Sequence, residues 1–226
     1  MRPYFQDESV TLYLGDALEI LPALEVPSGN AFGFTDPPYN VGMDYGKGVH
    51  DNMEHSVFLA WTRLWIEYLR HLTDSMAIYV PAKHTRSIWN ILGDDFRQVV
   101  LEWTPAGPIR NGIINQHATI LTNTRFPGNK SSGVSDVWRN LPSKRMGYAF
   151  HEVDFDHPGA TSEGITRKAV GSLGQNAQTV IDPFAGTGTT LMIAKERGMQ
   201  AIGIEKSEQW AEVAAKRLMS TTPALL

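Results

Sequence analysis

Two consecutive prolines, Pro37 and Pro38, interrupt the chain directly after the apolar run at 31–34. Proline lacks a backbone N–H donor and holds the residue before it in an extended conformation, so a strand that reaches this pair must end there. The strand end then carries an acid, Asp36, and an aromatic ring, Tyr39. Ligands bind at the carboxyl ends of strands in an open parallel sheet. A carboxylate, a fixed carbonyl and a ring predict a pocket for a flat group that bears an amino group.

Strand-like and helix-like stretches alternate along the whole chain, which is typical of a doubly wound α/β fold with a mostly parallel sheet. Short apolar and β-branched runs predict strands at 10–14, 31–35, 75–80, 98–103, 117–122, 179–181 and 200–204. Amphipathic spacing predicts helices at 17–24, 54–72, 84–92, 163–173, 191–197 and 209–219. With 226 residues, the chain is expected to form one catalytic domain, 1–226.

The composition is that of an ordinary globular protein, with 42% hydrophobic and 19% charged residues. The chain has no cysteine, which excludes disulfides and thiolate metal sites and is compatible with the cytoplasm. No apolar run approaches the roughly 20 residues that cross a bilayer. His84 and His117 lack metal-ligand spacing and are expected to be ordinary surface or edge residues. We therefore expect a cytoplasmic protein without a metal or a membrane partner.

The net charge of −4 argues against a protein that coats nucleic acid indiscriminately. A segment at about 105–156 is rich in Gly, Ser and Pro and has little periodicity, so we expect a loop-rich insertion there. Between 106 and 150 the sequence contains six basic residues and a single acid, Asp136. They form either a solvated loop or a local surface that contacts phosphates. The basic residues are Arg110, Arg125, Lys130, Arg139, Lys144 and Arg145.

A glycine-rich turn near the end of the chain repeats the pattern of strand, acid and turn. Asp182 ends a buried strand, Gly186 and Gly188 precede a helix, and Glu205 ends the next strand. An acid about 20 residues after such a turn is placed to bind ribose hydroxyls. The two glycines alone are equally typical of a close turn between a strand and a helix, whereas the added acids favour a nucleotide site.

The details of this turn exclude two common phosphate sites. A P-loop requires Lys and then Ser or Thr after its last glycine, but Gly188 is followed by Thr189 and Thr190. A dinucleotide-binding turn requires a small residue where Leu191 stands. A carboxylate at Asp182 would also repel a pyrophosphate. The expected ligand is a nucleoside that carries an ammonium group and no phosphate, such as S-adenosylmethionine.

Taken together, these stretches resemble the amino-methylating DNA methyltransferases in their permuted, or beta, order, with the DPPY motif before the glycine turn. The matching stretches are 12–19, 35–40, 157–158, 180–190, 203–205 and 215–218. The resemblance implies a seven-stranded, doubly wound sheet of the class I S-adenosylmethionine-dependent methyltransferase type, circularly permuted.

The resemblance implies that Asp36, Pro37, Pro38 and Tyr39 form the catalytic motif. The Asp36 carboxylate and the Pro37 carbonyl would hold the amino group of the target base, and Tyr39 would stack on that base after it leaves the duplex. The methyl group would then pass in line, without a covalent intermediate. Asn40 would contact the DNA, and 40–52 could close over the base as a lid.

A cofactor site is implied by the same resemblance. Asp182 would face the charged end of S-adenosylmethionine, and Glu205 would accept hydrogen bonds from both ribose hydroxyls. Asp16 would lie near the adenine ring, although a plain helix cap is an equally good reading and both can hold. The full set of cofactor residues is Asp16, Asp182, Phe184, Ala185, Gly186, Thr187, Gly188, Thr189 and Glu205.

The implied function is site-specific methylation of adenine N6 in DNA, since Asp at the first position of the DPPY motif favours adenine within the family. Cytosine N4 in DNA and adenine in RNA are the alternatives of the same class. An inactive cofactor-binding subunit and an enzyme of small-molecule metabolism are alternatives of other classes. Because the region available for reading DNA is short, specificity requires either a short site or a second subunit, such as a homodimer.

Overall fold

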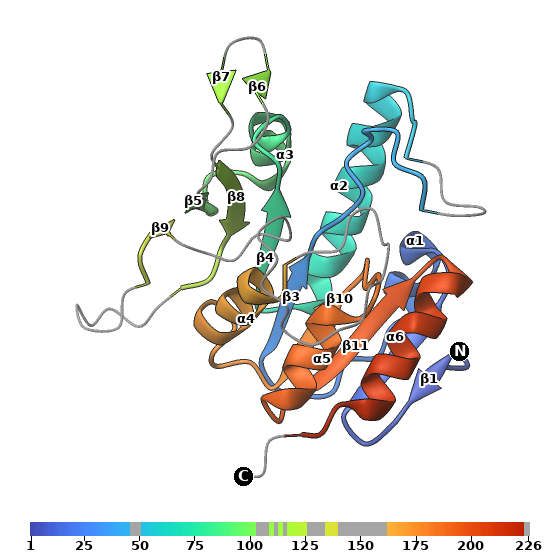
Figure 1. Ribbon diagram of the computed structural model, residues 1–226. Coiled ribbons are helices and arrows are strands. Elements are labelled where there is room, and N and C mark those ends of the chain that lie inside the picture. The colour runs from blue at the N-terminus through green and yellow to red at the C-terminus, as the bar shows by residue number, and fades with distance from the viewer. Residues whose placement is uncertain are drawn as a thin grey trace.

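The computed structural model describes residues 1–45, 51–102, 117–125, 134–139 and 162–223, and the backbone of 109–110 and 113–114. These residues form a central sheet with helices on both faces (Figure 1). Its strands are β1 (Phe5–Gln6), β2 (Val10–Leu14), β3 (Ala31–Thr35), β4 (Ser75–Val80), β5 (Arg97–Glu102), β8 (His117–Thr122), β9 (Val137–Trp138), β10 (Thr179–Asp182) and β11 (Gln200–Glu205). A separate hairpin consists of β6 (Ile109–Arg110) and β7 (Ile113–Ile114). The helices are α1 (Ala17–Ile20), the 3₁₀ turn η1 (Leu21–Ala23), α2 (His55–Leu72), α3 (Thr85–Leu92), α4 (Glu163–Ser172), α5 (Thr189–Glu196) and α6 (Glu208–Ser220).

Within the described residues, the main sheet has nine strands in the order β1-β2-β11-β10-β3-β4-β8-β5-β9. The strands from β2 to β4 in this order are parallel, and β8 runs antiparallel to both β4 and β5. The doubly wound, mostly parallel α/β fold expected from the sequence is therefore confirmed. Seven strands are the predicted ones, while β1 and β9 have two residues each, too few to produce an alternating pattern.

Part of the segment expected to be an insertion, about 105–156, belongs to the central sheet. β8 lies between β4 and β5, and its Ile120 and Leu121 are buried. β9 extends the sheet beside β5, and its Trp138 is also buried. An insertion outside the core can therefore comprise only the remaining residues of this segment, and its role in reading DNA stays a prediction.

The two central strands that position the site are β3 and β10. Every residue of both strands is buried, as expected for parallel strands with helices on both faces. Thr179 pairs with Ala31, and Ile181 pairs with Gly33, in parallel register. The carboxyl ends of the two strands, and with them the two sequence motifs, consequently lie side by side.

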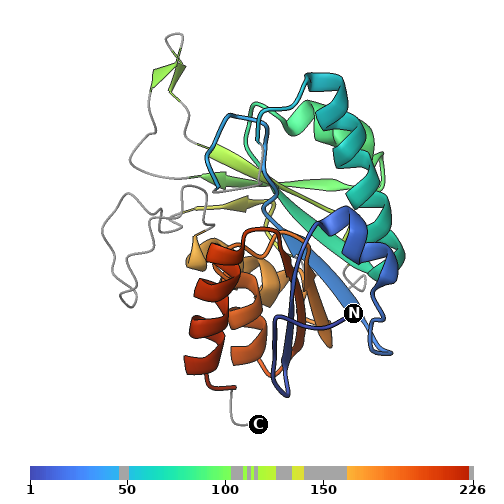
Figure 2. The same cartoon turned by 90° about the vertical axis from the view of Figure 1, so that its right-hand side faces the viewer.

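Helices cover the two faces of the sheet in separate groups (Figure 2). α4, α5 and α6 lie on one face, where Val170 and Leu191 belong to one apolar cluster. α1, α2 and α3 lie on the other face, where Trp65 and Ile88 belong to a second cluster. In the part of the chain that the structure describes, no helix combines the length and apolar character needed to cross a membrane.

Candidate active site

A direct hydrogen bond joins the two sequence motifs at the carboxyl edge of the sheet. The hydroxyl of Thr35, at the end of β3, donates to Oδ1 of Asp182, at the end of β10, over 2.7 Å. The backbone N–H of Phe184 donates to the same oxygen over 3.0 Å. The Asp182 side chain is only 3% exposed. Its burial raises the pKa of the carboxyl, against the opposing effect of hydrogen bonds from Thr190, Thr35 and the Phe184 N–H. Asp182 is thus engaged within the protein, and its predicted contact with the charged end of a cofactor remains a prediction.

The glycine turn follows β10 and leads into α5. Gly186 and Gly188 adopt φ angles of 52° and 79°, in the left-handed region that glycine adopts without strain. A Cβ atom on Gly188 would lie 2.9 Å from the Cβ of Ala214, so only glycine lets the turn approach α6 this closely. The turn lies at the same edge of the sheet as Asp36, and the N–H groups of Ala185, Gly186 and Gly188 are hydrogen-bonded within the protein.

Glu205, at the end of β11, holds the glycine turn from the neighbouring strand. Its Oε2 accepts from the N–H of Gly186 over 2.8 Å, and its Oε1 accepts from the N–H of Ser207 over 2.7 Å. Burial raises the pKa of Glu205, while these backbone hydrogen bonds act in the opposite direction. An ionised carboxylate has about four lone-pair positions, so these two bonds leave acceptor capacity for the hydroxyls of a ligand.

Asp16 lies beside this carboxylate, at the end of β2. The N–H of Gly15 donates to the carbonyl of Glu205 over 2.9 Å, which places the two strand ends together. Oδ1 of Asp16 accepts from the N–H of Leu18 over 2.9 Å, so the predicted helix cap is present. Lys206 Nζ lies 2.9 Å from Oδ2. Burial opposes ionisation of Asp16, but the hydrogen bonds from Lys206 and Leu18 lower its pKa.

Arg217, on α6, is hydrogen-bonded to the glycine turn, a role that the sequence did not predict. Its Nη1 donates to the carbonyl of Thr187 over 2.7 Å, to the Thr187 hydroxyl over 3.0 Å and to the Thr189 hydroxyl over 3.1 Å. Burial lowers the pKa of this guanidinium. Thr187 and Thr189, two of the predicted cofactor residues, are therefore held by a common donor. Nothing in the sequence spacing indicates this contact, because α6 follows the turn only after another strand.

Asp36, Pro37 and Tyr39 lie at the end of β3, next to the glycine turn. Pro37 is buried, Asp36 is half-buried and the Tyr39 side chain is 7% exposed. Burial, and then the nearby charge of Asp36, raise the pKa of Tyr39 well above its ordinary value. The pKa of Tyr79, on β4, is raised for the same two reasons. Tyr39 and Tyr79 thus both lie close to the Asp36 carboxylate.

Aromatic side chains form a continuous row from Tyr39 to the glycine turn. The Tyr39 ring stacks on His84, with ring centroids 6.0 Å apart and planes at 18°. His84 in turn meets Phe58 of α2 edge to face, at 5.7 Å. Farther along α2, Trp61 and Trp65 pack against Phe184, at 5.4 and 5.3 Å. The side of α2 that faces the sheet therefore connects the DPPY motif with the Phe of the glycine turn.

The sequence expectation for His84 was wrong. This residue is 6% exposed, because its imidazole packs against the rings of Tyr39 and Phe58. His117, at the beginning of β8, is exposed as expected. The polar neighbours of His84 in the sequence, Lys83 and Thr85, gave no sign of this burial.

The segment after Tyr39 is held by Asp51, a residue that the sequence did not single out. The Asp51 side chain is 4% exposed and accepts hydrogen bonds from the backbone N–H groups of Asn40, Val41 and Met43. Asn40 adopts a φ of 55° and exchanges hydrogen bonds with the backbone of Met53. The part of the expected lid nearest the catalytic motif is therefore built around specific contacts, while 46–50 lie outside the described residues.

The end of this segment reaches the other half of the site. Nε1 of Trp210, on α6, donates to the carbonyl of Tyr45 over 3.0 Å. Burial, and then the charges of Asp51, Asp36 and Glu205, raise the pKa of Tyr45. Tyr45 therefore lies close to acids of both sequence motifs, Asp36 and Glu205.

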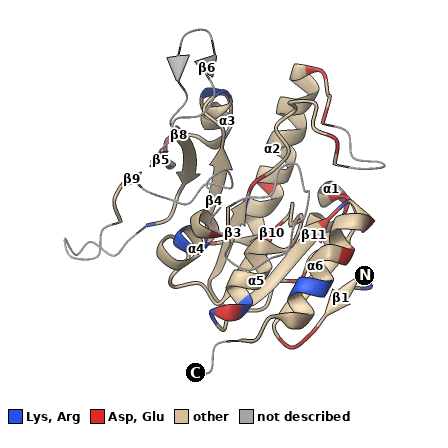
Figure 3. Ribbon diagram, viewed as in Figure 1, with Lys and Arg blue, Asp and Glu red and all other residues tan. Residues whose placement is uncertain are grey.

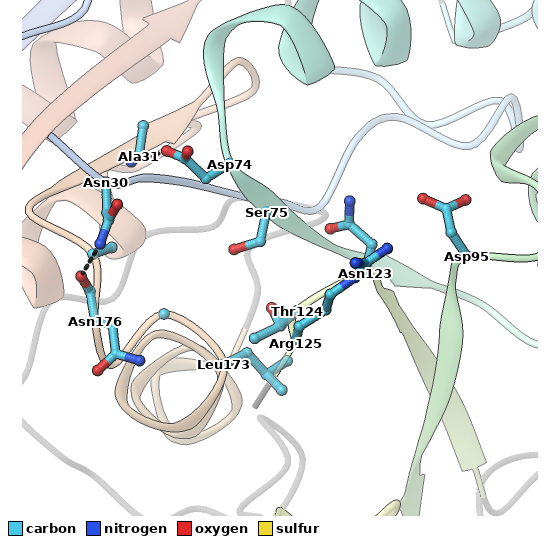
Figure 4. A pocket seen from close by; sticks show the side chains of 12 residues that line it. Asn30, Ala31, Asp74, Ser75, Asp95, Asn123, Thr124, Arg125, Leu173 and Asn176 are labelled. Carbon is cyan, nitrogen blue, oxygen red and sulfur yellow. Dashed lines mark hydrogen bonds between the residues drawn. The ribbon is translucent and has the colours of Figure 1, made fainter. Parts of the chain in front are cut away.

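The structure does not bring the predicted basic residues together at this site. Arg125 lines a polar pocket of about 400 Å³ at the amino ends of β3 and β4, on the sheet edge opposite to Asp36 (Figure 4). Arg139 lies 3.0 Å from Glu102 in an exposed ion pair. Arg110 is placed only by its backbone on β6, and three further candidates lie outside the described residues, namely Lys130, Lys144 and Arg145. Figure 3 shows the described basic residues as separate spots, several of them next to acids.

Comparisons with known proteins find similarity to DNA methyltransferases. A family model described as DNA methylase, of the N6/N4 methyltransferases, matches residues 116–216. The type II methyltransferase M.ScaI of Streptomyces caespitosus is 23% identical, over 99% of this chain and 86% of the relative. M.HpaI of Haemophilus parainfluenzae is 25% identical, over 92% and 74%. The DNA adenine methyltransferase YhdJ of Escherichia coli is 23% identical, over 95% and 84%.

Solved structures share the fold. TTHA0409 of Thermus thermophilus, complexed with S-adenosyl-L-methionine, superposes with a TM-score of 0.66, at 22% identity over 95% of both chains. The cytosine-N4-specific PvuII DNA methyltransferase gives a TM-score of 0.69, at 14% identity over 96% of this chain and 88% of that one. The fold is that of the class I methyltransferases. This chain is similar to DNA methyltransferases, the proteins that its motifs resemble.

Proposed function

We propose that this chain is an S-adenosylmethionine-dependent DNA methyltransferase that acts on the N6 amino group of adenine. The observation that carries the proposal is the hydrogen bond between Thr35 and Asp182, which fixes the DPPY motif against the glycine turn. A methyl donor held by one motif and an amino acceptor held by the other would therefore face each other, and such positioning supplies much of the rate in a transfer between two bound groups.

The residues at the glycine turn suit the proposed cofactor. The acceptor capacity that remains on Glu205 matches two ribose hydroxyls, and the Gly186–Gly188 turn lets the backbone approach a ligand closely. The acids around the turn favour a cationic ligand over a phosphate. S-adenosylmethionine supplies an electrophilic methyl group when bound. The proposed cofactor residues are Asp16, Asp182, Phe184, Ala185, Gly186, Thr187, Gly188, Thr189 and Glu205.

The DPPY motif would act on the target base. We propose that the Asp36 carboxylate and the Pro37 carbonyl accept the two N–H groups of the amino group and direct its lone pair toward the methyl donor. Asp36 would also stabilise the positive charge that develops on the nitrogen. Tyr39 would stack on the base, which must leave the duplex because a paired amino group cannot reach the donor.

The choice of adenine rests on Asp36, since Asp at this position favours adenine within the family. The relative YhdJ is named a DNA adenine methyltransferase, whereas PvuII is named cytosine-N4-specific. The two substrates present the same kind of amino group, so the identity of the base needs a chemical test. We also propose that the basic residues of 105–156 contact DNA, which footprinting with the same preparation tests. Light scattering tests whether the chain forms a homodimer.

The deciding experiment uses tritiated S-adenosylmethionine with the purified protein and unmethylated double-stranded DNA, single-stranded DNA or RNA. The products are digested to nucleosides and separated by chromatography. We expect the label in N6-methyl-2′-deoxyadenosine. Label in N4-methyl-2′-deoxycytidine would replace adenine by cytosine, and label in RNA alone would exclude DNA as the substrate. Cofactor binding without label in any nucleic acid would favour an inactive cofactor-binding subunit.

A further inference from the structure

His84 is a buried polar residue next to the catalytic motif, and the proposed function gives it no role. It lies just beyond β4, the strand adjacent to β3, at the sheet edge that carries Asp36. Its side chain is 6% exposed, and its Nε2 is buried without a hydrogen-bond partner among the described residues. The rings of Tyr39 and Phe58 contact the imidazole. Both are carbon surfaces that do not satisfy a ring N–H.

A buried nitrogen without a partner costs stability, because it has lost its hydrogen bonds with water and gained none in the protein. A phenylalanine ring would keep the contacts with Tyr39 and Phe58 and avoid this cost. Histidine at this position is therefore unfavourable for the chain alone and becomes favourable where a ligand supplies the missing partner.

The position of His84 indicates which ligand this is. In the proposed function, the target base stacks on Tyr39, whose ring is in contact with the imidazole. Burial, and then the charges of Lys83 and His55, lower the pKa of His84, while the charge of Asp51 acts in the opposite direction. The imidazole is therefore neutral near pH 7, and a neutral imidazole has one N–H donor. When the amino group of adenine donates to Asp36 and Pro37, its ring nitrogens N1 and N7 remain as acceptors.

We propose that His84 is a binding residue of the target-base pocket, where its Nε2–H donates to a ring nitrogen of the flipped base next to the amino group. This inference rests on the proposed function, since it requires a base on Tyr39. It assigns recognition of the ring edge to His84 and leaves recognition of the amino group to Asp36 and Pro37.

The test combines one variant with altered substrates. His84→Phe keeps the ring and removes the donor. Methylation is measured with duplex DNA that carries adenine, 1-deazaadenine or 7-deazaadenine at the target position. We expect His84→Phe to lower kcat/KM on adenine by about tenfold, the size of one hydrogen bond. One of the two deaza bases should lower wild-type kcat/KM by a similar factor and cause no further loss in His84→Phe.

Two controls separate this role from a structural one. The thermal midpoint of His84→Phe should equal or exceed that of wild type, and its affinity for S-adenosylmethionine in calorimetry should be unchanged. Thr62→Val, on α2, removes another buried side-chain atom that has no partner in the part of the chain that the structure describes, and should leave methylation unchanged. The inference is wrong if His84→Phe methylates all three substrates as wild type does. It is also wrong if each deaza base lowers the kcat/KM of His84→Phe by the same factor as that of wild type. If wild type methylates no DNA, the proposed function itself fails.

Discussion

The hydroxyl of Thr35 and the carboxylate of Asp182 are hydrogen-bonded across the ends of two adjacent parallel strands, over 2.7 Å. The two residues lie far apart in the sequence, yet they belong to the two motifs that define the site. Because Asp182 is buried, this bond both satisfies its oxygen and fixes the distance between the motifs. The relative position of the two motifs therefore depends on this buried hydrogen bond between the ends of β3 and β10.

Thr35→Val should therefore destabilise the chain. The change keeps the shape of the side chain but removes a donor to a buried carboxylate, which costs about 1–3 kcal/mol in the free energy of unfolding. Urea denaturation followed by circular dichroism measures the difference. Thr62→Val is the matched control, since the Thr62 hydroxyl is buried and has no hydrogen-bond partner within the described parts of the chain, and its loss should cost little. Equal stabilities of the two variants would show that the bond to Asp182 contributes nothing.

Asp182→Asn should change how stability depends on pH. Burial raises the pKa of Asp182 above its ordinary value of 3.8, so the folded chain holds the proton more tightly than the unfolded chain. The stability that this group contributes is fully present below about pH 3.8 and is lost as the pH rises through the folded pKa. Asparagine cannot ionise and still accepts a hydrogen bond from Thr35. The free energy of unfolding of the variant, relative to that of wild type, should thus increase as the pH rises from about 4 to 7. A difference in unfolding free energy that is constant over this range would contradict the prediction.

Much of the fold followed from local sequence patterns. Long strands such as β3 and β4, and the amphipathic α2, were predicted to within a residue or two because their apolar periodicity extends over several residues. β1 and β9 are too short to show a period, and each exists because a longer neighbouring strand offers free backbone groups. The strand at 117–122 was predicted, but its place as β8 between β4 and β5, two strands that precede it, is an order that the sequence does not reveal.

The site was only partly predictable for a related reason. Asp36 and Glu205 stand in motifs whose residues are close together in the sequence. His84, Asp51 and Arg217 act through contacts with residues far from them in the chain, and such pairs leave no spacing to recognise. Burial was also decisive for His84, since tertiary packing rather than composition removed it from solvent.

Asp36→Ala should abolish methyl transfer while the cofactor still binds. The carboxylate is predicted to hold the amino group and to stabilise its developing charge, and removal of one such group lowers kcat by about 100-fold or more. Transfer of tritium to DNA and calorimetric titration of S-adenosylmethionine measure the two effects separately. Asp94→Ala, at an exposed position after α3, serves as the control. Near-normal methylation by Asp36→Ala would remove the role proposed for this carboxylate.

Glu205→Gln should weaken cofactor binding. Glutamine can replace only one of the two carboxylate oxygens that accept from Gly186 and Ser207, and it lacks the charge that strengthens bonds to ribose hydroxyls. Loss of a charged hydrogen bond corresponds to about a 10- to 100-fold increase in Kd. Glu208→Gln, at an exposed position in the first turn of α6, should leave Kd unchanged. Equal affinities of Glu205→Gln and Glu208→Gln would exclude the ribose contact.

Arg217→Met should also weaken cofactor binding, although Arg217 is expected to act only through the glycine turn. Methionine keeps much of the aliphatic stem and removes the three hydrogen bonds that hold Thr187 and Thr189. With the turn less fixed, part of the binding energy is used to order it, so we expect Kd for S-adenosylmethionine to rise about tenfold. At saturating cofactor, kcat should stay close to that of wild type, because the hydrogen bonds of Arg217 to Thr187 and Thr189 hold the glycine turn, which is expected to bind the cofactor and not the target base. Lys216→Met alters the adjacent residue, which forms an exposed pair with Glu212, and should change neither constant. A fall in kcat with unchanged Kd would show instead that Arg217 positions the reacting groups, and a loss of stability without any change in Kd would reduce it to a packing residue.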